Sequence, residues 1–388
     1  MTNDPQGRYD AYLDSLEREL AMKVGDGPVR AGQMHWGGGT PTYMSATQIE
    51  RAFKMIDRRV KWTDDATRSI EAYPDHRTMS DAKLDMLADL GFNEISFGIE
   101  SLDPTVLEAI NRRHDIESIR YWVDRARKRS FGVHVDLVYG LPYQTVENFQ
   151  QTIDLLLTIQ PDRLATFSFM YTPFTIKHQR AIPRASVPSS EDRFRLYEVM
   201  QERLATSGYT TVGVDHWVRG DKDPLAIAAK KGEVVYHFQG YEPADRETFL
   251  GFGSSAISFA QGRYFQNLRS IEEYTEALAA GRLPIIHGNA AHLTADDRIR
   301  HRVVMQHVMA DLVVDKKRIE NEFGIQFDTY FKSALDTLRD MERDKLVSGV
   351  DGPRISIEPM GRAFIRNIAF AFDAHAGPAG APVLRVVP

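Results

Sequence analysis

The sequence predicts an α/β protein built on an incomplete parallel (β/α)6-type, TIM-like barrel, with a small helical domain at its C-terminal end. Two observations support this class. Strand-like and helix-like segments alternate over residues 30–217, and the helices are long enough to return the chain for parallel pairing. Beyond Ile271 the apolar residues recur mainly at helical spacing, which indicates a separate domain.

Short apolar stretches between turn residues predict the strands. They lie at Gln33–Trp36, Thr67–Ala72, Glu94–Glu100, His134–Gly140, Leu164–Tyr171 and Thr210–Trp217.

Capping residues mark the predicted helices. An amphipathic pattern gives a first helix near Tyr9–Val24. Ser45 and Gln48 form a capping box before the second, and Asp103-Pro104 opens another. Later helices are predicted over Ile116–Ser130, Thr145–Ile159, Ser190–Gly208, Thr294–Leu312, Thr329–Leu346 and Pro359–Phe372, with a hairpin at Val350–Ile357.

These elements divide the chain into three expected parts. Residues 1–217 form the partial barrel. Residues 218–270 are rich in glycine and aromatic side chains and are expected to cover its mouth. Residues 271–388 form a helical, winged-helix-like domain.

Composition limits the possible partners. The formal charge of −6 gives no sign of a nucleic-acid partner. There is no targeting segment and no apolar run of about 18 residues, so we expect a cytoplasmic monomer with no membrane partner. The sequence contains no cysteine, which excludes thiolate nucleophiles and thiolate-held metal clusters built from these residues.

Three predicted strands deliver acidic residues to one place. Glu71 and Glu100 end the second and third strands, and Asp136 lies in the fourth. Because active sites of parallel barrels lie at the carboxyl ends of the strands, the three together favour a site for ribose hydroxyls or an ammonium group. Each acid alone is equally consistent with a structural salt bridge. Arg112 is a candidate for a ligand carboxylate, although alone it is better explained as a solvated helix-end arginine.

Two other motifs leave alternatives open. Gly37-Gly38-Gly39-Thr40-Pro41 follows the first strand, where bare backbone suits either a ligand or a tight turn. It matches neither a Walker loop nor a dinucleotide fingerprint. Asp215-His216 is consistent with a proton relay or with a hydrogen-bonded structural histidine.

Longer motifs carry a resemblance to a known family. Met34–Tyr43 (MHWGGGTPTY) and Asp136–Thr145 (DLVYGLPYQT) are similar to strand signatures of oxygen-independent coproporphyrinogen III oxidases, which are radical S-adenosylmethionine enzymes. Further similar blocks are Pro161–Leu164, Gly213–His216, Phe238–Tyr241, Gly251–Ser258 and Gly361–Ile368.

The resemblance implies that two S-adenosylmethionine molecules bind at the barrel mouth. Glu100 stands where the family usually has glutamine, and Met170 replaces a small residue; the added charge alters hydrogen bonding to the second cofactor. The positions that match the family's contacts are Gly38, Gly39, Thr40, Glu71, Glu100, Arg112, Asp136, Met170 and Ile257.

The same resemblance implies a [4Fe–4S] cluster, held by a Cys-x3-Cys-x2-Cys loop that opens the family's barrel. This sequence starts after that segment, so we expect a truncated chain with no ligands for the cluster and no radical chemistry of its own. Two further interpretations stay open. One is a paralogue without a cluster that binds a tetrapyrrole or S-adenosylmethionine. The other is a related radical enzyme of haem handling, such as a methyltransferase, likewise truncated.

The activity implied by the resemblance is the oxidative decarboxylation of coproporphyrinogen III to protoporphyrinogen IX, with an external electron donor. A tetrapyrrole is broad, flat and ringed by carboxylates, so aromatic and basic residues suit it. The candidate substrate contacts are His216, Trp217, Phe238, Tyr241 and Arg184. The alternative is that these aromatic residues simply form core.

Overall fold

The computed structural model describes residues 7–25, 27–237, 239–243, 248–286 and 291–375. It divides the chain into two compact units. Unit 1 contains residues 1–207 and 248–291, and unit 2 contains residues 208–247 and 292–388. The segment expected to cover the barrel mouth, residues 218–270, therefore contributes to both units, and its covering role stays a prediction.

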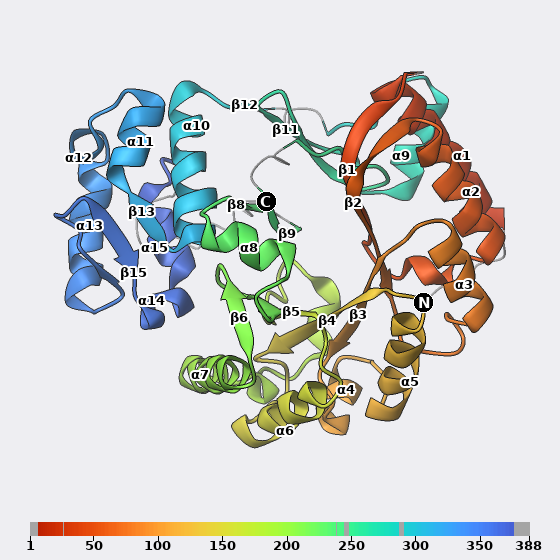
Figure 1. The fold of residues 1–388 in the computed structure, drawn as a ribbon, viewed down its shortest axis with the longest axis horizontal. Coiled ribbons are helices and arrows are strands. Elements are labelled where there is room, and N and C mark those ends of the chain that lie inside the picture. The colour runs from red at the N-terminus through yellow and green to blue at the C-terminus, as the bar shows by residue number, and fades with distance from the viewer. Residues whose placement is uncertain (1–6, 26, 238, 244–247, 287–290, 376–388) are drawn as a thin grey trace. The chain divides into compact units, whose positions relative to one another are not determined.

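Unit 1 is built on a parallel sheet whose first five strands follow chain order (Figure 1). All four pairings between neighbours are parallel. The strands are β1 (Val29–Trp36), β2 (Val60–Ala72), β3 (Glu94–Glu100), β4 (Gly132–Tyr139) and β5 (Arg163–Ser168). This arrangement confirms the predicted partial parallel barrel, although β1 and β2 begin earlier than their predicted counterparts.

Helices connect these strands on the outer side of the sheet (Figure 1). Side-chain caps fix where several begin: Ser45 and Gln48 form the predicted capping box, and Ser80, Asp103 and Thr145 accept backbone N–H groups in the same way. The helices are α2 (Ala46–Asp57), α3 (Asp81–Asp89), α4 (Pro104–Ala109), α5 (Ile116–Arg127), α6 (Val146–Leu157) and α7 (Ser190–Thr206).

The remaining elements of unit 1 come from its first and last segments, which contact each other. Helix α1 (Gly7–Val24) contacts α2 and α9 (Ile271–Ala279), and strands β10 (Ile257–Ala260) and β11 (Arg263–Gln266) form an antiparallel pair. Strand β12 (Ala291–His292) lies where the chain passes from unit 1 to unit 2.

A buried carboxylate, that of Glu19 on α1, ties these segments together. It is inaccessible to solvent and accepts hydrogen bonds from Asn267 Nδ2 (2.6 Å), Gly253 N (2.8 Å) and Tyr274 Oη (2.6 Å). The Lys23 ammonium lies 2.7 Å away, and its own pKa is lowered by burial. Every partner is a donor, so an acceptor-only carboxylate satisfies the whole group.

Unit 2 begins with a difference from the sequence prediction. The expected strand Thr210–Trp217 is a hairpin of β6 (Tyr209–Val212) and β7 (His216–Arg219), paired antiparallel. Gly213 has a φ of +59°, a conformation that glycine adopts at little cost, so the chain reverses there. The unpredicted helix α8 (Pro224–Lys230) follows, and then an antiparallel pair of β8 (Val234–His237) and β9 (Gly240–Pro243).

The remainder of unit 2 is mainly helical with a small sheet, in agreement with the predicted fold class. The domain bounds 271–388 stay a prediction, and α9, which falls within them, lies in unit 1. Strands β13 (Val313–Asp315), β15 (Arg354–Ile357) and β14 (Val347–Ser348) form that sheet in this order. Three predicted helices are broken: Thr294–Leu312 turns π-helical over Val303–Asp311 (η5), Thr329–Leu346 is interrupted at Phe331, and Pro359–Phe372 is interrupted at Phe364. The helices are α10 (Ala295–Arg302), α11 (Lys316–Phe323), α12 (Phe327–Tyr330), α13 (Lys332–Arg343), α14 (Pro359–Ala363) and α15 (Ile365–Phe372).

No helix in the described ranges is long and apolar enough to cross a membrane.

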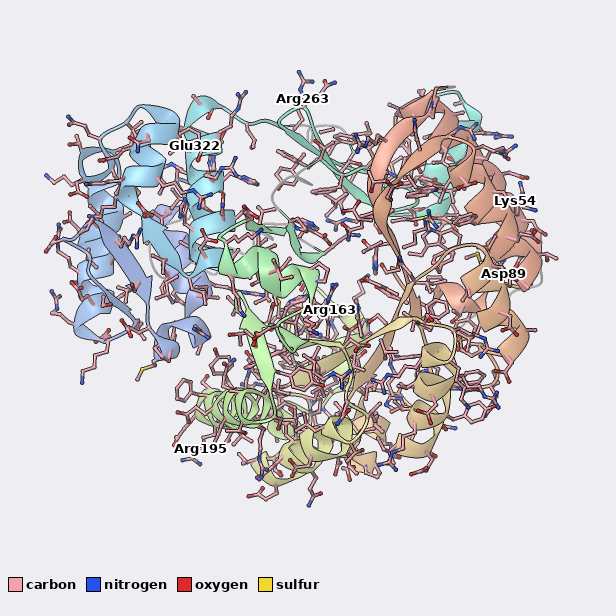
Figure 2. The ribbon with its side chains drawn as sticks, viewed as in Figure 1. Lys54, Asp89, Arg163, Arg195, Arg263 and Glu322 are labelled. Carbon is pink, nitrogen blue, oxygen red and sulfur yellow. The ribbon has the colours of Figure 1, made fainter. Side chains whose placement is uncertain are left out.

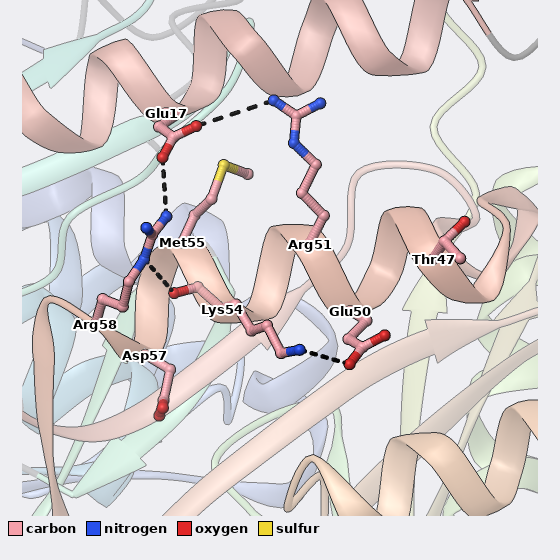
Figure 3. A pocket seen from close by; sticks show the side chains of 8 residues that line it. All are labelled: Glu17, Thr47, Glu50, Arg51, Lys54, Met55, Asp57 and Arg58. Atoms are coloured by element: carbon pink, nitrogen blue, oxygen red, sulfur yellow. Dashed lines mark hydrogen bonds and ion pairs between the residues drawn. The ribbon is translucent and has the colours of Figure 1, made fainter.

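Glu19→Gln should lower the free energy of unfolding by about 3–5 kcal/mol, because it leaves Lys23 buried without its counter-ion and turns an amide donor toward other donors. Urea denaturation measures this loss. Glu17→Gln on the same helix is the matched control. Glu17 lies in the open, 500 Å³ groove between α1 and α2 and pairs with Arg51 and Arg58 at its surface (Figure 3). Its loss should stay below about 1 kcal/mol. Equal losses in the two variants would contradict the assignment.

Candidate cofactor-binding site

Successive residues of the parallel strands face opposite sides of the sheet, and the two faces differ sharply. On β3, Ile95, Phe97 and Ile99 are fully buried, as are Val133 and Val135 on β4. The residues between them are only partly buried. The strand register gathers polar side chains on that second face: His35, Ser69, Glu71, Glu94, Ser96, His134, Asp136 and Arg163. This face therefore suits a polar ligand better than a packed barrel core.

Three carboxylates interact at the carboxyl ends of β2, β3 and β4. Glu100 ends β3 at a bulge, with a φ of +65° that is uncommon for a residue with a side chain. A Cβ on Gly98 would lie 2.9 Å from its Oε1, so the Glu100 carboxylate lies close to Gly98. Burial, followed by the negative charges of Asp136 and Glu71, raises the pKa of Glu100 to about 7, although Arg112 opposes the shift. The three acids lie on neighbouring strands, as the parallel topology predicts, and their role in binding a ligand stays a prediction.

Arg112 supplies the positive charge of the site. Its Nη2 lies 3.3 Å from Glu100 Oε1, and its guanidinium lies over the Tyr73 ring, 5.4 Å from the centroid. The Tyr73 hydroxyl in turn accepts a hydrogen bond from the backbone N–H of Arg113 at 3.0 Å. The ring and the carboxylate hold the guanidinium on two sides, and the Arg112 side chain stays about one-third exposed.

The glycine run follows β1 directly, beside the strand that carries Glu71. A Cβ on Gly37 would collide with the Glu71 carboxylate and the His35 ring. Gly38 and Gly39 have φ values of +82° and +141°, which disfavour other residues. Thr40 then precedes a 3-10 turn, η1 (Pro41–Tyr43). The run is thus a tight turn that also leaves its backbone open next to an acidic side chain.

Sequence reasoning missed the residues that orient these acids. His35 Nδ1 lies 2.8 Å from Ser69 Oγ, and His35 Nε2 lies 3.2 Å from Glu71 Oε1. A second ion pair lies on the same polar face, nearer the start of the strands. Glu94 Oε1 lies 3.5 Å from Arg163 Nη1 (Arg163 is labelled in Figure 2). The sequence did contain one signal for these contacts: Ser69 and Glu71 are two residues apart on a strand, so both side chains face the same side of the sheet.

Two predicted cofactor contacts lie outside this carboxylate group. Met170 is two residues past β5, and its carbonyl accepts a hydrogen bond from Gln179 Nε2 at 2.9 Å. Ile257 begins β10 and pairs with Gln266. Their proposed roles stay predictions.

The candidate substrate residues are divided between the units. Arg184 belongs to unit 1, where its guanidinium lies over Tyr171, 5.6 Å from the ring centroid. In unit 2, His216 Nδ1 lies 2.8 Å from Asp215 Oδ1, which is the pair expected of a proton relay. Trp217 is buried, and Phe238 lies outside the described residues.

Tyr241 fits the plain-core alternative best. Its hydroxyl accepts a hydrogen bond from Val214 N (2.9 Å) and donates one to Met309 O (3.1 Å). The ring packs in a unit 2 cluster with Val212, Val218 and Leu225.

The site residues fit S-adenosylmethionine. That ligand combines a sulfonium and an ammonium group with ribose hydroxyls and one carboxylate. The acids at the strand ends match the cationic and hydroxyl groups, and Arg112 matches the carboxylate. A thiolate-held [4Fe–4S] cluster does not fit, because these 388 residues include no cysteine. Within the described ranges, no group of three or more histidines and carboxylates could hold a metal ion either.

Comparison with known proteins agrees with this geometry. A sequence profile of the radical SAM superfamily matches residues 5–156. The oxygen-independent coproporphyrinogen III oxidase of Escherichia coli is 36% identical over 375 residues, which cover 95% of this chain and 80% of the relative. The chain belongs to this oxidase family. Its Synechocystis member is 34% identical and matches 94% of this chain and 78% of its own length.

A solved structure extends the similarity to the fold. The coproporphyrinogen III oxidase of Escherichia coli, described as a radical SAM enzyme, superposes with a TM-score of 0.90 at 34% identity. The match covers 96% of this chain and 85% of the other. The family assignment and the TIM-like barrel class predicted from the sequence are both confirmed.

Glu100→Gln should change how stability depends on pH. The folded-state pKa of Glu100, about 7, exceeds its ordinary value of 4.5, so the folded protein binds the extra proton between these values. Stability of the unaltered protein should therefore fall, relative to the variant, as pH rises from 4.5 to 7, by on the order of 1–3 kcal/mol. Urea denaturation at several pH values measures the difference. The exposed Glu108→Gln on α4 serves as control, and a wild-type profile parallel to that of Glu100→Gln would refute the assignment.

Proposed function

We propose that this chain supplies the S-adenosylmethionine site and the substrate site of an oxygen-independent coproporphyrinogen III oxidase. In that reaction two propionate side chains become vinyl groups, and each propionate loses carbon dioxide, two electrons and one proton. The observation that carries the proposal is the group of coupled carboxylates with Arg112 at the strand ends, in a chain similar to such oxidases over 95% of its length. That similarity favours the oxidase over the methyltransferase and the binding-protein interpretations.

The roles of individual residues follow from their charges. Arg112 would bind the amino acid carboxylate of the cofactor. Glu71 and Asp136 would accept hydrogen bonds from its ammonium group or ribose hydroxyls, and the backbone of Gly38, Gly39 and Thr40 would lie against it. Met170 and Ile257 would add apolar contacts. When bound, S-adenosylmethionine supplies the adenosyl group that removes hydrogen from the substrate.

Glu100 gives the site a property that a glutamine would not. Burial and the neighbouring acids raise its pKa to about 7, so its carboxylate keeps its proton to a higher pH than an ordinary glutamate does. A cationic ligand nearby favours the ionised form, so ligand binding would release a proton from Glu100. We also propose that the protein is a cytoplasmic monomer that depends on an external electron donor.

Arg112→Ala should weaken S-adenosylmethionine binding by about 1.5–3 kcal/mol, the range of a charge-assisted hydrogen bond. Isothermal calorimetry with the full chain measures the change. Arg113→Ala is the matched control. The Arg113 side chain is exposed, and the hydrogen bond to Tyr73 comes from the backbone N–H of Arg113, which alanine keeps. Equal affinities of wild type and Arg112→Ala would remove Arg112 from the site.

A fusion tests the reaction itself. The cluster-binding segment that the family resemblance implies is joined to the start of this chain, and the purified fusion is loaded with iron and sulfide. Under anaerobic reduction with S-adenosylmethionine, it should convert coproporphyrinogen III to protoporphyrinogen IX. A fusion that folds and cleaves S-adenosylmethionine, yet leaves coproporphyrinogen unchanged, would show that the substrate assignment is wrong.

A further inference from the structure

The end of β5 and the segment that follows it in unit 1 display apolar side chains to solvent. Phe167 and Met170 are each more than 40% exposed, Ile176 is 37% exposed, and Phe174 is 92% exposed. Large apolar side chains gathered on one exposed segment mark an interaction site more often than chance exposure does. The segment follows a carboxyl end of the parallel sheet, the edge that carries the carboxylate group.

This segment is internally braced. The buried Gln179 side chain accepts a hydrogen bond from Thr172 N (2.5 Å) and donates one to Met170 O (2.9 Å). Tyr171 Oη donates to Ile182 O at 3.2 Å, and Arg180 Nε donates to Pro173 O at 3.0 Å. Because the backbone on both sides of Phe174 is held by these bonds, its ring is presented outward by a fixed scaffold. Such preorganisation lowers the entropy cost of binding.

The segment is also cationic. Residues 167–189 contain Lys177, Arg180 and Arg184 but no aspartate or glutamate, in a chain whose net charge is −6. All three side chains are exposed, and the contacts described for Arg180 and Arg184 are with backbone carbonyls and the Tyr171 ring, not with a carboxylate. A fixed apolar surface surrounded by cations complements one kind of ligand: a flat apolar molecule with carboxylates at its edge.

We infer that residues 167–184 form the surface that receives the tetrapyrrole, with Phe174 against the macrocycle and Lys177, Arg180 and Arg184 toward its propionates. This inference rests on the proposed function and adds residues to it. The Phe174 ring supplies apolar contact, and the cations supply charge-assisted hydrogen bonds to the carboxylates. Since Lys177 is exposed, its contribution should weaken as salt concentration rises.

Binding of coproporphyrin III, the stable oxidised form of the substrate, tests this inference with the full chain. Phe174→Ala and Lys177→Glu should each weaken binding about tenfold in a fluorescence titration at low salt, and Lys177→Glu should flatten the salt dependence. Phe174 is 92% exposed and Lys177 is also exposed, so both variants should denature at the wild-type urea concentration. Phe370→Ala and Lys332→Glu, exposed residues of unit 2, are the matched controls and should bind within twofold of wild type.

Several results would overturn the inference. Binding that is unchanged in both variants would do so, as would no binding by the wild type. Sedimentation showing a dimer that Phe174→Ala dissociates, with porphyrin binding unchanged, would assign the surface to a second copy of the chain.

Turnover by the fusion protein separates this inference from the proposed function. A raised KM for coproporphyrinogen in Phe174→Ala and Lys177→Glu, with unchanged S-adenosylmethionine affinity, supports both. Normal turnover with unchanged KM refutes the surface alone, whereas absent turnover in a fusion that cleaves S-adenosylmethionine refutes the function.

Discussion

The alternation of side chains along parallel strands is the constraint on which the site depends. Alternate residues of β2, β3 and β4 point to the same face up to the bulge at Glu100, and the Glu100 carboxylate has an acidic neighbour on each adjoining strand, Glu71 on β2 and Asp136 on β4. Helices cover the opposite, apolar face. The charged face is thus a direct consequence of burying Ile95, Phe97 and Val135.

Carboxylates placed this close together repel one another, and three features of the site reduce that repulsion. Arg112 offsets part of it from one side, while His35 hydrogen-bonds Glu71 on the other. Glu100 further lowers the repulsion because its raised pKa favours the neutral, protonated form. Positive charge on a ligand would stabilise these carboxylates, and a ligand with two cationic groups therefore matches the site. The segment after β5 has the opposite character, because it is apolar and basic.

Much of this was accessible from the sequence. Helix caps such as Ser45 and Thr145 act locally, through bonds to N–H groups three residues on, so their helices were predicted with accurate starts. The convergence of Glu71, Glu100 and Asp136 followed from parallel topology alone. The predictions that were wrong depended on the conformation of a single residue or on contacts between residues far apart in the sequence. The turn at Gly213 split a predicted strand, the π-helical segment at Val303–Asp311 leaves no composition signal, and the burial of Tyr241 depends on the distant Met309 carbonyl.

The Glu19 cluster also bears on how the protein is made. Its partners Gly253 and Tyr274 follow Glu19 by 234 and 255 residues, and the chain of unit 2 between residues 208 and 247 is synthesised before them. At roughly 5–20 residues per second, the Glu19 carboxylate waits about 10–50 s on the ribosome before Tyr274 exists. During that interval the apolar residues of α1 lack part of their final covering. Unit 1 therefore cannot complete its fold in order from its first residue during synthesis, because the last partners of Glu19 are made after part of unit 2.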